Sequence, residues 1–473
     1  MTQWITAIGQ GWLVDGAVPG PDVDEFADAG DVIAALARHR GDSLLAVQHP
    51  HRTPRARADG LSVTDVLPAA RRELDRLLAT SYRPVTDVVA PYLVDGPDGA
   101  ALGVLCLVDP NEISRVRHSE QVYPAVVAER ATMLAGLGHA TSAAMLIPVT
   151  DGARLTDAVS RAVRTPPAVR TVDPAGRIHR LWLVGPGPDQ DRLLSVLRAG
   201  PLMVADGNHR VAASARAGSN LLALVTAGPD LRVGAFHREL TGTGLSAADL
   251  EAAWRRAGLR VRHDSAPHPP DPHDRENPDD HQRNPSSRPP DPSDHHQNPS
   301  SRRRDANGDQ QNPSSRPPDP SDHRQSRHDH RQDPHGRRQS PSSHPPDSNG
   351  HRQDPSGQAP RSPGVVRVLA GRTRLVIDLP APEPGEPLPR IDHAIVERLL
   401  IAAALGIDPE GPHVRPVPAG HPPGPDVDAV LEVAPVPMSD VIAVHAQNRL
   451  MPRKSTYVTP KPRTGLLIAA LTP

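Results

Sequence analysis

The sequence predicts an α/β fold with two ordered parts separated by a long disordered insert. Short apolar runs of strand length alternate with segments of helical periodicity, which is typical of helices packed on sheets. Residues 264–363, in contrast, hold almost no apolar side chains, and strand-like runs flank them on both sides. We therefore expect an N-terminal α/β part over 1–263, a disordered insert over 264–363 and a C-terminal part over 364–473.

The first part contains several elements with clear patterns. Its best-defined helix is expected over 64–79, where apolar residues recur at helical spacing and Thr64 offers an N-cap. Residues 31–38 should form a helix and 43–47 a strand. Further strands are expected at 101–108, 143–149, 177–184, 202–204 and 221–225, and further helices at 125–136, 151–164 and 190–198.

The segment 202–218 is expected to fold as a buried strand, a sharp turn and a short alanine-rich helix that ends at a glycine. Asp206 and Gly207 are typical turn and N-cap residues, and His209 and Arg210 fall in the first helical turn. Free backbone N–H groups and the positive end of the helix dipole lie there, so main chain and Arg210 together could hold an anion. The sharp hypothesis is a phosphate site; the alternative is that Asp206 only caps the helix and Arg210 faces water.

The insert is expected to interrupt a sheet. A strand is expected at 259–262 before it, and others at 365–369 and 372–379 after it. Because loop entropy grows slowly with length, deletion of 265–362 should leave a folded protein. Elsewhere in this half, helices are expected at 247–257, 391–405 and 439–446, and strands at 431–435 and 465–471.

The insert itself consists of Pro, Ser, Asp, His, Arg, Gln and Asn, and residues 284–295 recur unchanged at 312–323. Such a segment cannot bury enough apolar surface to offset the entropy of ordering it. Its histidines match the spacing of no defined metal site, so we expect them to be solvated. The sequence does not identify a protein partner for it.

Composition favours a soluble, cytoplasmic protein. The formal net charge of −2, with no large block of one sign, favours neither a nucleic-acid partner nor an anionic membrane. No signal-peptide pattern opens the chain, and no apolar run approaches membrane-spanning length. The single cysteine, Cys106, lies in an apolar run and is expected to be a buried thiol in a reducing compartment.

Lysine usage draws attention to residues 451–462. Only two lysines, Lys454 and Lys461, occur in the chain, and the remaining residues of the Lys and Arg class are arginine. This suggests sites that need a compact charge or an amine able to lose its proton, with coincidence as the alternative.

Several motifs together resemble the bacterial and archaeal domain-of-unknown-function family 1015, linked to the ParB/sulfiredoxin superfamily through an ADGHHR-type turn. That turn stands here at 205–210, the family's HRLW strand at 179–182, and its MPxKSTYFxPKxxTGL signature at 451–466. The helix before that signature is matched by 391–406. The resemblance covers most of the chain outside the insert, and it implies a ParB/sulfiredoxin-like core with a second α/β part.

The resemblance implies a nucleotide-binding turn. Superfamily relatives, which include sulfiredoxins, CTP-hydrolysing ParB proteins and a free-serine kinase, place a nucleotide's phosphates on it. Asn208 stands where sulfiredoxin-like turns carry a reactive cysteine, which argues against sulfinic-acid reduction. DNA-binding helices and a dimerising tail of the ParB type are not evident. The best hypothesis is a nucleotide-dependent phosphotransferase, a small-molecule kinase, that acts on a hydroxyl acceptor such as a free amino acid.

This hypothesis assigns roles to residues of the turn and of one upstream segment. Gly207, Asn208, His209 and Arg210 would bind the nucleotide, and Asp206 and His209 would take part in catalysis. Glu120 would be the base: His118-Ser119-Glu120 resembles the family's HE-x-T stretch, although the histidine is displaced by one position. The alternative for Glu120 is an ordinary surface carboxylate.

The lysine segment would complete the pocket from the C-terminal part. Lys454, Ser455, Thr456, Tyr457 and Lys461 would contact substrate or phosphate, although Tyr457 alone would more often be core packing. The expected cofactor is ATP or ADP with Mg²⁺, which would arrive with the nucleotide because the sequence shows no dedicated metal cage. Two alternatives remain: a non-catalytic nucleotide- or metabolite-binding regulatory module, and a structural protein in which the turn is only a helix cap.

Overall fold

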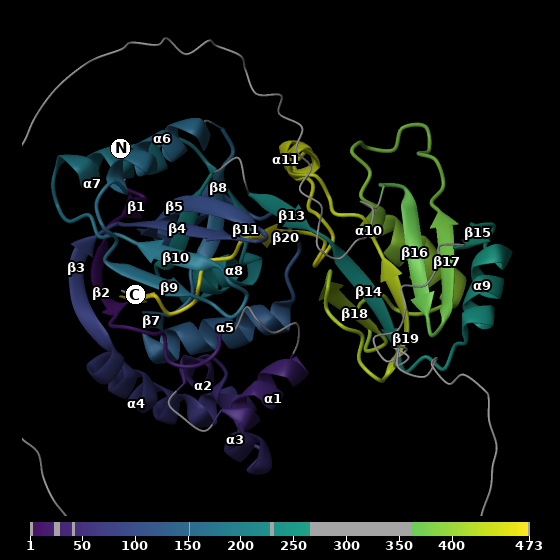
Figure 1. Cartoon of the computed structure of the whole chain (residues 1–473), viewed down its shortest axis with the longest axis horizontal. Coiled ribbons are helices and arrows are strands. Elements are labelled where there is room, and N and C mark those ends of the chain that lie inside the picture. The colour runs from purple at the N-terminus through teal and green to yellow at the C-terminus, as the bar shows by residue number, and fades with distance from the viewer. Residues whose placement is uncertain are drawn as a thin grey trace, which may run out of the picture. The chain divides into compact units, whose positions relative to one another are not determined.

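The computed structural model describes residues 3–22, 29–39, 43–150, 152–227, 231–264 and 362–471. They form a mixed α/β fold, which confirms the expected fold class (Figure 1). The predicted insert lies almost wholly outside the described residues.

A nine-stranded, mostly antiparallel sheet forms the centre of the first part. Its order is β6-β11-β8-β12-β5-β4-β10-β9, and β1 pairs with β5 at the side of this path. The pairs β11–β6 and β12–β8 are parallel. The strands are β1 Ile5–Thr6, β4 Ala90–Gly96, β5 Gly99–Val108, β6 Val116–Arg117, β8 Ala144–Pro148, β9 Val169–Val172, β10 Ile178–Leu181, β11 Leu202–Asp206 and β12 Leu221–Thr226.

Alternating side chains of the central strand β5 enter two different cores. Leu105 and Leu107 belong to one core with residues of α4 and α5, whereas Val104 and Cys106 belong to another with residues of α6 and α7. This follows from the period of two along a strand, and Figure 1 shows these helix pairs on opposite faces of the sheet. The helices are α4 Val63–Ser81, α5 Pro124–Leu137, α6 Gly152–Ala162, α7 Pro188–Leu197 and α8 Asn208–Ala217.

Cys106 is buried, as expected from its apolar run. The side chain is fully buried, and burial raises its thiol pKa to about 12.

A four-stranded sheet joins the two ends of the chain. In the order β3-β2-β21-β7, the late strand β21 pairs with β2 and β7. Near it lie several short helices. A small ladder, β13–β20, joins residues 232–234 to the lysine segment. These elements are β2 Ile8–Val14, β3 Tyr82–Val88, β7 His139–Ala140, β13 Arg232–Gly234, β20 Tyr457–Thr459, β21 Leu467–Ala470, α1 Ala29–Arg38, α2 Leu44–Gln48, η2 Pro50–Arg52, α3 Pro54–Ala58 and η3 Pro110–Arg115.

A six-stranded antiparallel sheet includes strands from both sides of the insert. Its order is β15-β17-β16-β19-β14-β18, so the strand before the insert and the first strand after it both pair with β17. Trp254 and Leu400 belong to the core beneath this sheet. The elements are β14 Phe236–Thr241, β15 Arg260–His263, β16 Val365–Ala370, β17 Thr373–Asp378, β18 Val414–Pro418, β19 Val427–Glu432, α9 Ala247–Arg256, α10 Asp392–Ile395, the π-helical η4 Val396–Ala403 and α11 Met438–Ala446.

Most expected elements are present, with one clear error of type. The apolar run at 43–47 is not a strand but helix α2, because a five-residue apolar run has no periodicity that separates a strand from a buried helical turn. The strand expected at 431–435 begins earlier, at Val427. Eleven strands had no sequence prediction, namely β1, β2, β3, β4, β6, β7, β9, β13, β14, β18 and β20.

Candidate functional site

The turn between β11 and α8 adopts the expected strand–turn–helix geometry. Gly207, rather than Asp206, is the N-cap residue of α8, and its φ of 99° lies in the left-handed region. A Cβ atom at this position would meet Arg210 Nε at 2.7 Å and Ala144 Cα at 3.2 Å. Glycine is therefore required both by backbone conformation and by space.

Asp206 lies between two cations. Its carboxylate pairs with Arg210 of the same turn and accepts a hydrogen bond of 2.9 Å from Lys461 Nζ. The three side chains are only 15–20% exposed. Burial alone would raise the pKa of Asp206, but the charges of Lys461 and Arg210 outweigh it and hold this pKa well below the ordinary value.

Arg210 is held by the protein itself. Besides Asp206, its guanidinium donates to the Ser142 hydroxyl and to the Ala143 carbonyl oxygen. These bonds tie α8 to the start of β8. In this arrangement Arg210 supports the turn rather than presenting a free guanidinium to an anion.

Asn208 fastens the turn to the segment that contains Glu120. Its side-chain oxygen accepts the Ser119 N–H at 3.1 Å and contacts His118 Nδ1 at 3.1 Å, while its amide nitrogen donates to Ser119 Oγ at 3.2 Å. The side chain is buried. Asn208 therefore positions segment 118–120.

His209 is a neutral imidazole that packs on Tyr123. Its Nε2 accepts the Tyr123 N–H at 2.9 Å, and the two rings stack with centroids 5.8 Å apart and planes 8° from parallel. Burial and the charge of Arg130, with smaller effects of Lys454 and Arg453, lower the His209 pKa to about 4. The side chain therefore brings no positive charge to the predicted nucleotide-binding turn at neutral pH.

Glu120 is bound by consecutive N–H groups of the lysine segment. Its carboxylate accepts the N–H groups of Lys454, Ser455 and Thr456 at 3.1, 3.2 and 2.9 Å, and it also accepts from the Thr456 hydroxyl. A bridge between Glu120 and Met451 brings the two segments together. Burial raises the pKa of Glu120, against the opposing effect of the Thr456 hydrogen bonds.

The turn that binds Glu120 has its own support. Lys454 has a φ of 51°, in the left-handed region, which lets successive N–H groups face one point. The Ser455 hydroxyl is buried and donates to the Pro452 carbonyl oxygen at 2.7 Å. Fully buried Arg238 of β14 donates to the carbonyl oxygens of Arg453 and Lys454, both at 3.1 Å.

The remaining two predicted residues, Tyr457 and Lys461, lie side by side. Lys461 Nζ lies 4.8 Å from the centre of the Tyr457 ring, and that ring meets Phe236 edge to face at 5.5 Å. Lys454 Nζ lies 5.7 Å from the Phe236 ring. Burial and the charge of Lys461 lower the pKa of Lys454. The two lysines are thus close enough to influence one another electrostatically.

The start of α8 presents unused donors. In the described part of the chain, the N–H groups of Gly207, Asn208 and His209 donate to no protein acceptor. Arg130 and Lys454 lie close enough that their charges lower the pKa of His209. Free N–H groups and cations at a helix start are the combination that binds an anion.

The fold also brings in residues to which the sequence assigned no role, namely Tyr123, Arg130, Arg238 and Arg453. Arg453 places its guanidinium 4.6 Å from the centre of the Tyr123 ring and pairs with Glu410. Only Arg453 carried a signal, because it lies inside the lysine segment. The other three come from an ordinary loop, helix and strand.

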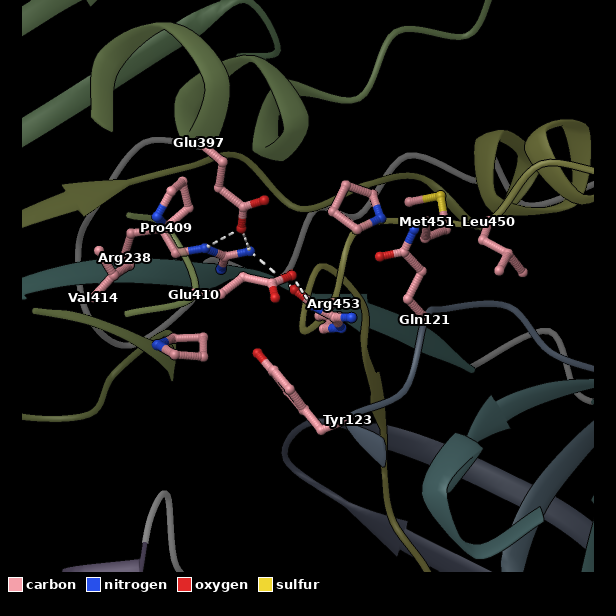
Figure 2. A pocket seen from close by; sticks show the side chains of 12 residues that line it. Gln121, Tyr123, Arg238, Glu397, Pro409, Glu410, Val414, Leu450, Met451 and Arg453 are labelled. Carbon is pink, nitrogen blue, oxygen red and sulfur yellow. Dashed lines mark hydrogen bonds and ion pairs between the residues drawn. The ribbon is translucent and has the colours of Figure 1, made fainter. Parts of the chain in front are cut away.

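The turn at 453–456, whose N–H groups bind Glu120, is called the lysine turn. A pocket of about 240 Å³ opens beside it (Figure 2). Tyr123 and Gln121 line it from the Glu120 segment, Arg238 and Glu397 from the six-stranded sheet and η4, and Arg453 from the lysine segment.

Groups of three or more His, Cys, Asp or Glu side chains able to hold a metal ion do not occur among the described residues. None of the described helices is both long and apolar enough to cross a membrane.

Comparison with solved structures gives chains of low identity. A conserved hypothetical protein from Pyrococcus furiosus is 9% identical, with 76% of this chain and 95% of that chain covered and a TM-score of 0.32. A free serine kinase in complex with AMP is 10% identical, with 76% and 92% covered and a TM-score of 0.33. SbnI with C-terminal truncation from Staphylococcus aureus is 10% identical, with 77% and 87% covered and a TM-score of 0.36.

No curated protein matches the chain. A family model does match: residues 34–274, half of the chain, fit the family described as a protein of unknown function, DUF1015. This match includes the β11–α8 turn, the Glu120 segment and the strand with His179. The chain therefore belongs to the DUF1015 family.

Proposed function

We propose that this protein is a nucleotide-dependent phosphotransferase that transfers a terminal phosphoryl group from ATP or ADP to a small hydroxyl acceptor. The observation that carries the proposal is the convergence of unused N–H groups at the start of α8 with cations from other elements. Phosphoryl transfer requires donors for the phosphates, cations beside them and a base near the acceptor. The α8 N–H groups, the cations Lys454 and Arg130, and Glu120 would supply these.

The phosphates would lie at the start of α8. The N–H groups of Gly207, Asn208 and His209 would donate to phosphate oxygens, and Lys454 and Arg130 would supply positive charge. Arg210 and Asp206 would hold the turn in shape through the bonds they already make. Mg²⁺ would be bound chiefly by the phosphates, as is usual for this ion.

Glu120 would act as the base. It would take the acceptor's hydroxyl proton as the acceptor oxygen forms its bond to the terminal phosphorus and the bond to the bridging oxygen breaks; the shortened nucleotide then leaves. Burial raises the pKa of Glu120, which makes the carboxylate a stronger base. Its Oε1 accepts three hydrogen bonds, whereas Oε2 accepts only one in the described structure, from the Lys454 N–H. The freer oxygen is the one suited to take a proton.

Nucleotide binding is tested by titration calorimetry with ATP and with ADP, each in the presence of Mg²⁺. Lys454→Met should weaken binding by about tenfold or more, because it removes a cation beside the phosphates. Arg192→Met is a matched control, since Arg192 is exposed on α7 and, among the residues that the structure describes, pairs only with Asp189. Equal affinity of the Lys454→Met protein and the wild type, with both folded, would contradict the assigned site.

A second candidate is a non-catalytic nucleotide sensor, and one observation favours it. The donors that surround Glu120 stabilise its ionised form and oppose proton uptake. Phosphorus NMR with a panel of hydroxyl acceptors separates the two functions. Transfer that is lost in Glu120→Gln while nucleotide affinity is kept identifies the enzyme, whereas binding without transfer to any acceptor identifies the sensor.

A further inference from the structure

We propose that the pocket beside the lysine turn binds the acceptor, and that this acceptor is a small amino alcohol whose ammonium group contacts Glu397 and Glu410. This inference rests on the proposed function, in which the acceptor is the molecule whose hydroxyl receives the phosphoryl group.

Arg238, the cation in the pocket wall, already uses its donors within the protein. Its Nε and Nη2 atoms donate to Glu397 Oε1 at 2.9 and 2.7 Å. Its Nη1 and Nη2 atoms also donate to the carbonyl oxygens of His237, Lys454 and Arg453. Arg238 is fully buried, and its positive charge is balanced by these partners. It shapes the pocket wall and leaves no donor for a ligand.

The carboxylates, in contrast, keep free oxygens. Arg238 uses only Oε1 of Glu397, and in the described structure Oε2 has no partner. Glu410 pairs with Arg453 through Oε1 and keeps its other oxygen at the pocket rim, where the side chain is 57% exposed. Two carboxylate oxygens without donors are the complement of an ammonium group.

The rest of the lining sets the size and character of the ligand. Pro409, Val414, Pro416, Leu450 and Met451 contribute apolar surface, and the volume of about 240 Å³ suits a compound of few carbon atoms. In Figure 2, Glu397 and Tyr123 enter the pocket from opposite sides. The Tyr123 hydroxyl has no hydrogen-bond partner within the described residues and is available to a ligand hydroxyl.

Tyr123 also connects this pocket with the start of α8. One contact of its ring is the stack on His209, and another is the Arg453 guanidinium 4.6 Å from its centre. Gln121 follows Glu120 directly in the chain and lines the pocket. Residues that line the pocket thus adjoin the proposed base in the chain and contact the start of α8, an arrangement suited to group transfer between the two sites.

Ligand-observed saturation-transfer NMR on the full-length protein, without nucleotide, tests the pocket. The probes are ethanolamine and ethylene glycol, which differ only in the amine. At pH 7.5 we expect ethanolamine to bind at least tenfold more tightly, and Glu410→Gln to remove most of that difference. Glu383→Gln, an exposed loop residue outside the pocket, is the control and should leave it unchanged.

Glu397→Gln gives an independent variant, and Glu410→Gln keeps the test valid if loss of the Arg238 partner unfolds that protein. Equal binding of the two probes, or stronger binding of acetate than of ethanolamine, would overturn the inference. Because the measurement uses no nucleotide, its result is separate from that of the calorimetry above. Nucleotide binding without amine binding would overturn the amine pocket and leave the phosphate site standing.

Discussion

Asp206 connects the turn with the far end of the chain. The cations on its two sides are Arg210, four residues later, and Lys461, which is 255 residues away. Each is largely buried, so loss of the carboxylate would remove a buried negative charge that both cations contact. Asp206 is therefore a structural centre of the site, and its contribution must be separated from any role in catalysis.

We predict that Asp206→Asn lowers the free energy of unfolding by about 3 kcal/mol at pH 7, as for other broken buried ion pairs. The pKa of Asp206 is depressed in the folded state, so its stabilisation is present above the unfolded pKa of about 4 and is lost as pH falls further. Urea unfolding of both proteins from pH 7 down to pH 3 measures this. The gap between their stabilities should narrow as pH falls from about 4 to 3; a constant gap would contradict the ion-pair account. Asp189→Asn, at an exposed pair, is the control.

His209 should titrate far below the usual range. Its pKa is about 4 in the folded protein, against about 6.5 in the unfolded chain. Between these values the unfolded chain binds the proton more readily, so the free energy of unfolding falls as pH drops from about 6.5 toward 4. Proton NMR of the His209 ring should give a midpoint near pH 4. Addition of ADP should raise that midpoint, because bound phosphates offset the cations that now lower it. A midpoint near 6.5 in the free protein would show that the surrounding charges are arranged differently.

At the scale of elements, the site consists of two turns that are connected through the segment containing Glu120. One is the β11–α8 turn, and the other is the lysine turn whose N–H groups bind Glu120. Asn208 links them by holding Ser119, the neighbour of Glu120. A substitution that shifts either turn should therefore also alter the structure of the other.

The two glycines at the ends of α8 make a matched test of the first turn. Both have positive φ, 99° at Gly207 and 62° at Gly218, but a Cβ atom meets nearby atoms only at Gly207. Gly218→Ala should cost about 1 kcal/mol from backbone strain alone, and Gly207→Ala about 1–3 kcal/mol more because Arg210 and Ala144 must move. Thermal and urea unfolding measure the difference. Equal losses would mean that the turn accommodates the added methyl group.

At the scale of the whole molecule, one sheet spans the insert. His263 at the end of β15 pairs with Leu375, and Val365 at the start of β16 pairs with Asp378, on the two sides of β17. From ladder spacing and rise per residue, the gap to be bridged is roughly 14 Å. The three residues that remain after deletion of 265–362 barely reach across it.

We predict that the same deletion with an added Gly/Ser linker of about six residues changes the free energy of unfolding by no more than about 1 kcal/mol. Circular dichroism and urea unfolding against the full-length protein provide the measurement. The deletion without a linker is the comparison and should be less stable, because it strains β15 or β16. Loss of cooperative unfolding in the linked protein would show that the insert takes part in the fold.

The sequence by itself determined the α/β class, most helices of the first part and the β11–α8 turn, because these depend on local periodicity and on residues adjacent in the chain. It also indicated the lysine segment, through composition alone. It did not separate helix α2 from a strand, because a short apolar run fits both. Strands such as β2, with three glycine or glutamine residues among its seven, lack a clear alternating pattern.

Only the tertiary structure decided what the predicted site residues contact. Arg210 and Asn208 are engaged by the protein, Ser455 is buried, and His209 is neutral because of neighbours from other elements. The Glu120 carboxylate meets N–H groups more than 330 residues away, and Tyr123 joins the turn to the pocket. Hydrogen bonding, burial and charge at such sites depend on groups that meet only after folding, so the residue types were visible in the sequence and their roles were not.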